Sequence, residues 1–67
     1  MIEITLNGAL HRLPAPATLA DLLDSLALTG KRLAVERNGE IVPRGLHGKT
    51  ALETGDRLEI VVAVGGG

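Results

Sequence analysis

The chain has 67 residues, a formal net charge of -1, no cysteine, and no Phe, Trp or Tyr. This length allows one small domain, and the lack of cysteine excludes disulfides, thiolate catalysis and cysteine-based metal sites. The basic residues are scattered and there are no aromatic side chains to stack on bases, so we do not expect binding to nucleic acid. The longest apolar run is residues 60–64, too short to span a membrane, and the N-terminus does not resemble a signal peptide. We therefore expect a cytoplasmic protein.

Residues 2–6 alternate apolar and polar side chains, which is the period of a half-buried strand. Asn7-Gly8 follows, and this pair is typical of a two-residue hairpin turn because both residues tolerate positive φ. Residues 9–13 can then return as a second strand. Pro14 is expected to end that strand because proline cannot donate to a ladder.

A helix is predicted over residues 19–28. Thr18 is placed to cap its N-terminus, with Asp21 three residues later in the position of a capping box. Four apolar side chains at helical spacing form one stripe for packing against a sheet, namely Leu19, Leu22, Leu23 and Leu26. Gly30 is expected to supply the left-handed residue that stops the helix, and Lys31-Arg32 to lie near its negative end.

Further strands are predicted at residues 33–37, 40–42 and 57–63. Asn38-Gly39 is a second hairpin signal, between the first two of them. Residues 44–49 contain two glycines and are expected to form a loop. Residues 50–53 are expected to form one helical turn that anchors Leu52 in the core.

This order of elements predicts an α+β fold, in which a small mixed sheet of four to five strands carries one main helix on one face. The simplest arrangement pairs the last strand with the first at the centre of the sheet. We expect one domain over residues 1–64, followed by a flexible glycine tail at residues 65–67. Three extended residues reach about 10 Å, so the tail can enter a narrow channel and present a terminal carboxylate to another enzyme.

Several segments, in this order, resemble one known family. They are the Asn7-Gly8 hairpin, the leucine-striped helix, the run VERNGEIVPR from Val35, the run LETGDRLEIV from Leu52, and the ending Val64-Gly65-Gly66-Gly67. Over nearly its whole length the chain resembles ThiS, the sulfur carrier family of thiamin (thiazole) biosynthesis. The resemblance implies a ubiquitin-like β-grasp fold. Many relatives carry a tryptophan after the Pro-Arg pair, where His47 is the nearest candidate here.

The resemblance also implies a mechanism. A ThiF-like enzyme would use ATP to adenylate the Gly67 carboxylate, a sulfur donor system would convert it into a thiocarboxylate, and a ThiG-like thiazole synthase would receive the sulfur. Gly65 and Gly66 would lie in the partner's channel, where a side chain would clash. The chain has no phosphate-binding loop, so ATP would bind to the partner. We expect a carrier rather than an enzyme, with no cofactor bound by this chain.

Docking to a partner needs a surface as well as a tail. By the period of two, Val61 and Ala63 lie on the face of the last strand opposite the face that carries Leu58. With Ala34 and Glu36 of the third strand they are predicted to form a partner-docking patch beside the tail.

A metal site is not expected. His11 and His47 are far apart in the sequence, and neither has a second ligand at helical spacing. We expect both to be surface or loop residues. Asp21 and Asp24 are better explained by the helix dipole than by acid-base chemistry.

Two other functions remain as alternatives. A carrier of the same architecture, resembling MoaD, would serve molybdopterin synthesis. A β-grasp interaction module would carry the glycine tail without any covalent chemistry. Residues added after Gly67 would abolish acceptor activity in either carrier and change nothing in the module.

Overall fold

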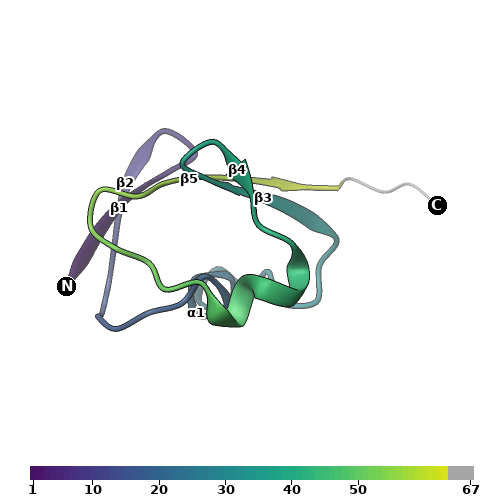
Figure 1. The fold of residues 1–67 in the computed structure, drawn as a ribbon, viewed down its shortest axis with the longest axis horizontal. Helices are drawn as coiled ribbons and strands as arrows, with labels where there is room; N and C mark the ends of the chain where they lie inside the picture. Colours follow the sequence, from purple (N-terminus) through teal and green to yellow (C-terminus); the bar gives the residue numbers. More distant parts are fainter. Residues whose placement is uncertain (64–67) are drawn as a thin grey trace.

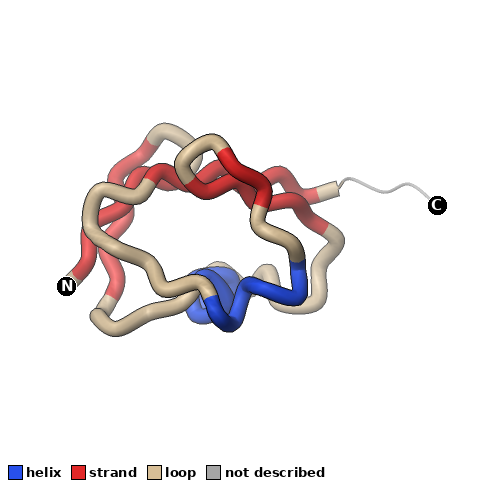
Figure 2. Tube along the Cα trace, in the orientation of Figure 1, coloured by secondary structure: helices blue, strands red, loops and turns tan. Residues whose placement is uncertain are grey.

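The computed structural model describes residues 1–63. The elements in chain order are β1 (Ile2–Leu6), β2 (Ala9–Leu13), α1 (Leu19–Ser25), β3 (Leu33–Arg37), β4 (Glu40–Ile41), the 3-10 helix η1 (Arg44–Lys49) and β5 (Arg57–Val62). The strands form one five-stranded sheet, and α1 and η1 lie together in a second layer on one of its faces (Figure 1, Figure 2). The predicted α+β fold, a mixed sheet with one main helix on one face, is confirmed.

The strand order is β2-β1-β5-β3-β4, so the last strand lies at the centre of the sheet beside the first, as predicted. β5 runs parallel to β1 and antiparallel to β3. Its register with β1 ends where Leu6 lies opposite Leu58. Its register with β3 continues to Leu33 opposite Val62. The second half of β5 therefore has a neighbouring strand on one side only.

The core lies between the sheet and the helix layer. Leu19 and Leu22 of α1 are fully buried, and burying one leucine contributes about 1.5–3 kcal/mol. They pack with Leu23 and with buried side chains from the strands and loops, namely Ile2, Ile4, Leu13, Ala17, Val35, Leu52, Leu58 and Ile60. The alternate strand residues point to the other side of the sheet. We call that side the open face; it carries Thr5, Leu10, Ala34, Glu36, Ile41, Arg57, Glu59 and Val61.

The start of α1 agrees with the sequence prediction. Thr18 has an extended backbone with ψ 170° and caps the helix. Its hydroxyl accepts a hydrogen bond from the Asp21 amide at 3.2 Å, and the Asp21 carboxylate accepts one from the Thr18 amide at 2.8 Å. This reciprocal capping box satisfies two backbone donors that the first turn leaves free.

The end of α1 differs from the sequence prediction. The helix stops at Ser25, and Ala27 rather than Gly30 takes the left-handed position that closes it, with φ 58°. The Ala27 amide donates to the Asp24 carbonyl at 3.0 Å and the Leu28 amide to the Leu23 carbonyl at 2.8 Å. These two bonds form a Schellman motif, which ends the helix before Gly30 is reached.

Because α1 is shorter than predicted, the basic pair Lys31-Arg32 does not lie in its last turn, where the structure has no basic residue. The prediction that this pair complements the negative end of the helix is therefore wrong.

The segment after β4 also differs from its prediction. Residues 44–49, expected to be a loop, form η1, and residues 50–53, expected to be a helical turn, are not helical. Residues 50–53 are not helical because of the backbone partners of this segment. The Leu19 amide donates to the Thr50 carbonyl and the Leu52 amide to the Ala17 carbonyl, both at 2.9 Å. Thr50–Leu52 is thus held extended against the start of α1, and Leu52 is buried as predicted.

Candidate functional site

The predicted attachment site Gly67 and the channel residues Gly65 and Gly66 lie outside the described residues. The structure does describe the place from which this segment leaves the sheet. β5 ends at Val62, and the Ala63 amide donates to the Arg32 carbonyl at 2.9 Å, which continues the β3 side of the ladder by one bond. The tail therefore starts from the central strand of the sheet, at the end farthest from Met1 (Figure 1).

The Asn7 side chain fixes the last part of β5. Its Oδ1 accepts a hydrogen bond from the Ile60 amide at 2.7 Å, and its Nδ2 donates to the Ile60 carbonyl at 3.2 Å. The chain turns away from β5 at this residue, with φ 48°, so the side chain takes over the pairing that the β1 backbone no longer supplies. The sequence correctly predicted Asn7 as a turn residue, but an Asn-Gly pair gives no signal of this second role.

The residues of the predicted docking patch are all exposed. Ala34 and Val61 are directly opposite each other on neighbouring strands, and Val61 is 67% exposed. Glu36 and Ala63 are exposed as well. Ala34, Val61 and Ala63 therefore lie at the end of the open face beside the start of the tail, and Glu36 lies farther along this face, opposite Glu59. The role of the four residues in docking stays a prediction.

Ile41 adds to this surface and was not predicted. It lies opposite Glu36 on β4 and is 63% exposed. The sequence gives residues 40–42 as a strand but does not fix the register of so short an edge strand, so the face on which Ile41 lies could not be derived from it.

The main electrostatic feature is Asp56, whose side chain is nearly buried in the turn before β5. Its carboxylate accepts hydrogen bonds from Arg37 Nε at 3.0 Å, Asn38 Nδ2 at 3.1 Å and the Glu53 amide at 2.9 Å. Burial alone would raise the pKa of Asp56, but these bonds and the Arg37 charge outweigh it and hold the pKa below its ordinary value. The carboxylate is already fully partnered, so we assign it a structural role.

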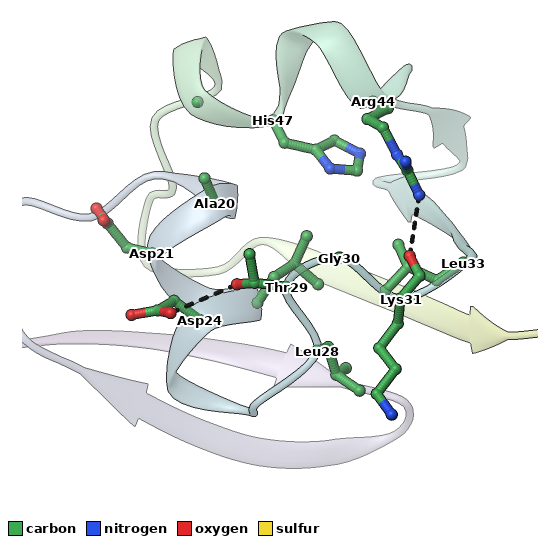
Figure 3. A pocket seen from close by; sticks show the side chains of 12 residues that line it. Ala20, Asp21, Asp24, Leu28, Thr29, Gly30, Lys31, Leu33, Arg44 and His47 are labelled. Atoms are coloured by element: carbon green, nitrogen blue, oxygen red, sulfur yellow. Dashed lines mark hydrogen bonds between the residues drawn. The ribbon is translucent and has the colours of Figure 1, made fainter.

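A groove of about 530 Å³ lies in the helix layer, between α1 and η1 (Figure 3). Leu28 and Leu33 give it apolar walls, and Arg44 and Lys31 lie along one side. Nη2 of Arg44 donates to the Lys31 carbonyl at 3.0 Å and so joins η1 to the segment that leads into β3. The charge on Arg44 is thus held in place by backbone contact rather than by an acidic side chain.

His47 also lines this groove, and the expectation that it is a surface or loop residue is wrong. It is 9% exposed, and its Nε2 lies 3.0 Å from the Val42 carbonyl oxygen. A carbonyl oxygen can only accept, so Nε2 carries the proton of this bond. His47 is buried because η1 forms where a loop was expected. His11 is half-buried on β2, opposite Ile4.

Within residues 1–63, no group of three or more His, Asp or Glu side chains is placed to hold a metal ion. In the same part of the chain no helix has the length and apolar character needed to cross a membrane.

A five-stranded mixed sheet with β1 and β5 parallel at its centre and one helix across one face defines the ubiquitin-like β-grasp class. Within this class the chain belongs to the ThiS family, whose family model matches residues 4–67. The fold and the family implied by the sequence resemblance are both confirmed.

Individual relatives agree with this assignment. The crystal structure of the thiamine biosynthesis protein ThiS from Geobacter metallireducens superposes with a TM-score of 0.81 at 28% identity, covering 98% of this chain and 100% of that one. Thiazole synthases of Paramagnetospirillum magneticum and Magnetococcus marinus are 39% and 41% identical over 66 residues. These matches cover 98% of this chain but only 20% of each synthase, so the chain spans about one fifth of the length of these relatives.

Proposed function

We propose that this chain is a sulfur carrier protein of thiamin biosynthesis and acts as a co-substrate rather than as an enzyme. The observation that carries the proposal is the ThiS family match, which runs through the terminal glycines to residue 67. Similarity to a thiamine biosynthesis protein and to two thiazole synthases supports the thiamin pathway over the MoaD-like alternative.

The proposed chemistry takes place on the Gly67 carboxylate. A carboxylate is unreactive toward sulfur nucleophiles until it gains a leaving group. One carboxylate oxygen attacks the α-phosphorus of ATP on a ThiF-like enzyme, and pyrophosphate leaves. A sulfur nucleophile from a donor system then attacks the acyl carbon, and AMP leaves to give the thiocarboxylate. A ThiG-like thiazole synthase accepts the sulfur in the next step.

The described residues support this role through position. The tail starts from the central strand of the sheet, whose last residues are held by Asn7 on one side and by Arg32 on the other. A rigid start to a thin glycine segment limits the positions that the reacting carboxylate can take in a partner's channel, which lowers the entropic cost of reaching it.

The docking surface is proposed to be the patch of Val61, Ala63, Ala34 and Glu36. Its apolar centre is the cross-strand pair Ala34 and Val61, directly upstream of the tail. A partner that covers this pair would remove apolar surface from water at the same place where it admits the tail.

The experiment that separates a carrier from an interaction module is a matched pair of extended chains. One carries a short Gly-Ser segment after Gly67, and the other carries the same segment before Met1, which is 82% exposed. We expect the first to lose all sulfur acceptor activity with the adenylating enzyme, and the second to keep it. Equal acceptor activity in both would show that sulfur does not attach at Gly67. No acceptor activity in either extended chain or in the unextended chain, with an enzyme that converts a known carrier, would support an interaction module whose tail carries no covalent chemistry.

A further inference from the structure

Successive residues of β5 point their backbone N–H and C=O groups alternately toward β3 and toward β1. Odd-numbered residues face β3: the Asn38 amide donates to the Arg57 carbonyl at 2.8 Å, and the Ala63 amide to the Arg32 carbonyl at 2.9 Å. Even-numbered residues face β1, where the Asn7 amide donates to the Leu58 carbonyl at 2.8 Å. The side on which a β5 amide points is therefore fixed by its place in the sequence.

Val62 is the next even-numbered residue of β5, so its backbone N–H and C=O also point toward the β1 side. β1 has no residue opposite Val62. The register of β1 with β5 ends at Leu58, and the Asn7 side chain pairs with Ile60. The N–H and C=O of Val62 point to the side from which β1 has turned away. Among residues 1–63, neither the strand registers nor the turn and side-chain hydrogen bonds supply them with a partner.

Apolar side chains flank these free backbone groups on both sides. Val61 is 67% exposed on the open face, and Val62 is 37% exposed on the helix side. A protein that covers both side chains also removes water from the N–H and C=O of Val62. Those groups then need new hydrogen-bond partners, because an unpaired buried amide is costly. An extended polypeptide strand supplies a carbonyl and an amide at the required spacing.

We propose that an extended segment of the thiazole synthase pairs with the free edge of β5 at Val62 and adds a strand to the sheet. The synthase is the occupant because two proteins of that name contain a region similar to this chain. Asn7 sets the limit of the pairing, since its side chain already occupies the edge at Ile60.

This pairing rests on the carrier role proposed above. It adds how the receiving enzyme binds the strand from which the tail leaves. It is distinct from burial of the open-face patch, because the groups involved are backbone atoms at the edge of the sheet. The substitution that removes such a group without removing a bond of the fold is Val62→Pro. Its N–H faces the free edge, and Val61, the residue before it, already has the extended backbone that proline requires of its predecessor.

The test titrates the 67-residue chain with the thiazole synthase of the same organism and follows amide hydrogen exchange by NMR. We expect the Val62 amide of the wild-type chain to exchange about tenfold more slowly in the complex, while the Ala63 amide, bonded to Arg32, is protected in both states. We expect Val62→Pro to bind at least about fivefold more weakly, and Val62→Ala, which keeps the N–H, to bind within about twofold of wild type.

Three results would overturn the strand pairing. They are unchanged Val62 exchange in a saturated wild-type complex, wild-type affinity in a folded Val62→Pro chain, and equal losses in Val62→Pro and Val62→Ala. The exchange measurement needs no variant, so it decides the matter even if Val62→Pro does not fold. Conversion of the wild-type tail to a thiocarboxylate by the adenylating enzyme, measured separately, shows whether the carrier role survives when the strand pairing fails.

Discussion

Arg37 on β3 and Asp56 in the turn before β5 form an ion pair, with Arg37 Nε 3.0 Å from Asp56 Oδ2. The Asp56 side chain is only 7% exposed. The same carboxylate accepts a hydrogen bond from Asn38, so it joins the turn after β3 to the turn that begins β5. This contact sets where β5 enters the sheet and therefore where the tail leaves it.

Replacing Asp56 by Asn should destabilise the fold by about 2 kcal/mol, because it removes the charge that Arg37 pairs with and disrupts buried hydrogen bonds. Urea denaturation of the variant and the wild-type chain measures the difference. Glu53→Gln in the same turn is the control, since the Glu53 side chain is exposed, and should change the free energy of unfolding little. Equal stability of all three chains would show that the Asp56 network contributes nothing.

The lowered pKa of Asp56 predicts how stability depends on pH. A carboxyl whose pKa is lower in the folded state stabilises the fold above its unfolded pKa of about 4. That stabilisation is lost as the pH falls from there through the folded pKa. We expect the free energy of unfolding to fall more steeply below about pH 4 in the wild-type chain than in Asp56→Asn. Parallel pH profiles of the two chains would contradict this account.

The Asn7 side chain should stabilise the end of β5. Asn7→Gly keeps the left-handed backbone, at φ 48° in the structure, and removes both hydrogen bonds to Ile60. We expect a loss of about 1–2 kcal/mol in the free energy of unfolding and faster exchange of the Ile60 amide. The amide of Ala63, which bonds to Arg32 on the other side of β5, is the internal control. An unchanged Ile60 exchange rate would refute the proposed role of Asn7.

A substitution at Ala27 is expected to stabilise the fold. Because Ala27 holds a left-handed backbone at φ 58°, Ala27→Gly should raise the free energy of unfolding by about 0.5–1 kcal/mol. Ser25→Gly, two residues earlier and still inside α1, should lower it by a similar amount, since glycine is unfavourable within a helix. Thermal or urea unfolding of both variants checks the opposite signs. A loss of stability in Ala27→Gly would contradict the Schellman geometry at this position.

The sequence predicted those parts of the fold that follow from local pattern and turn chemistry. Asn7-Gly8 and Asn38-Gly39 carry positive φ and connect the predicted strands, and Thr18 caps α1. The stop of α1 was missed because alanine is a rare left-handed residue, and the nearby Gly30 is the conventional choice. It too has a positive φ, but it lies after the helix has ended.

Structure that depends on contacts between segments far apart in the sequence could not be predicted from local sequence patterns. The extended Thr50–Leu52 segment depends on backbone bonds to Ala17 and Leu19, more than thirty residues earlier in the chain. The burial of His47 follows from η1 and was missed with it. The candidate site was predicted at the level of residue type and strand face, whereas the pairing of Asn7 with Ile60 required the register of β1 and β5.

The docking patch can be tested with two substitutions of similar exposure on the open face. Val61 and Leu10 are 67% and 65% exposed, but Val61 lies beside the tail and Leu10 lies on the edge strand β2. We expect Val61→Asp to weaken binding of the ThiF-like adenylating enzyme by about tenfold or more, as for residues at the centre of an interface. Leu10→Asp should bind as the wild type does. Equal effects of the two substitutions would place the docking surface elsewhere.

The central claim is that Gly67 is the covalent attachment point for sulfur. The most direct measurement incubates the chain with ATP, a sulfur source and the ThiF-like enzyme, and then records intact and fragment masses. The account predicts the mass change of one oxygen replaced by sulfur, located at Gly67. An unmodified chain, under conditions in which the same enzyme converts a known carrier to its thiocarboxylate, would contradict it.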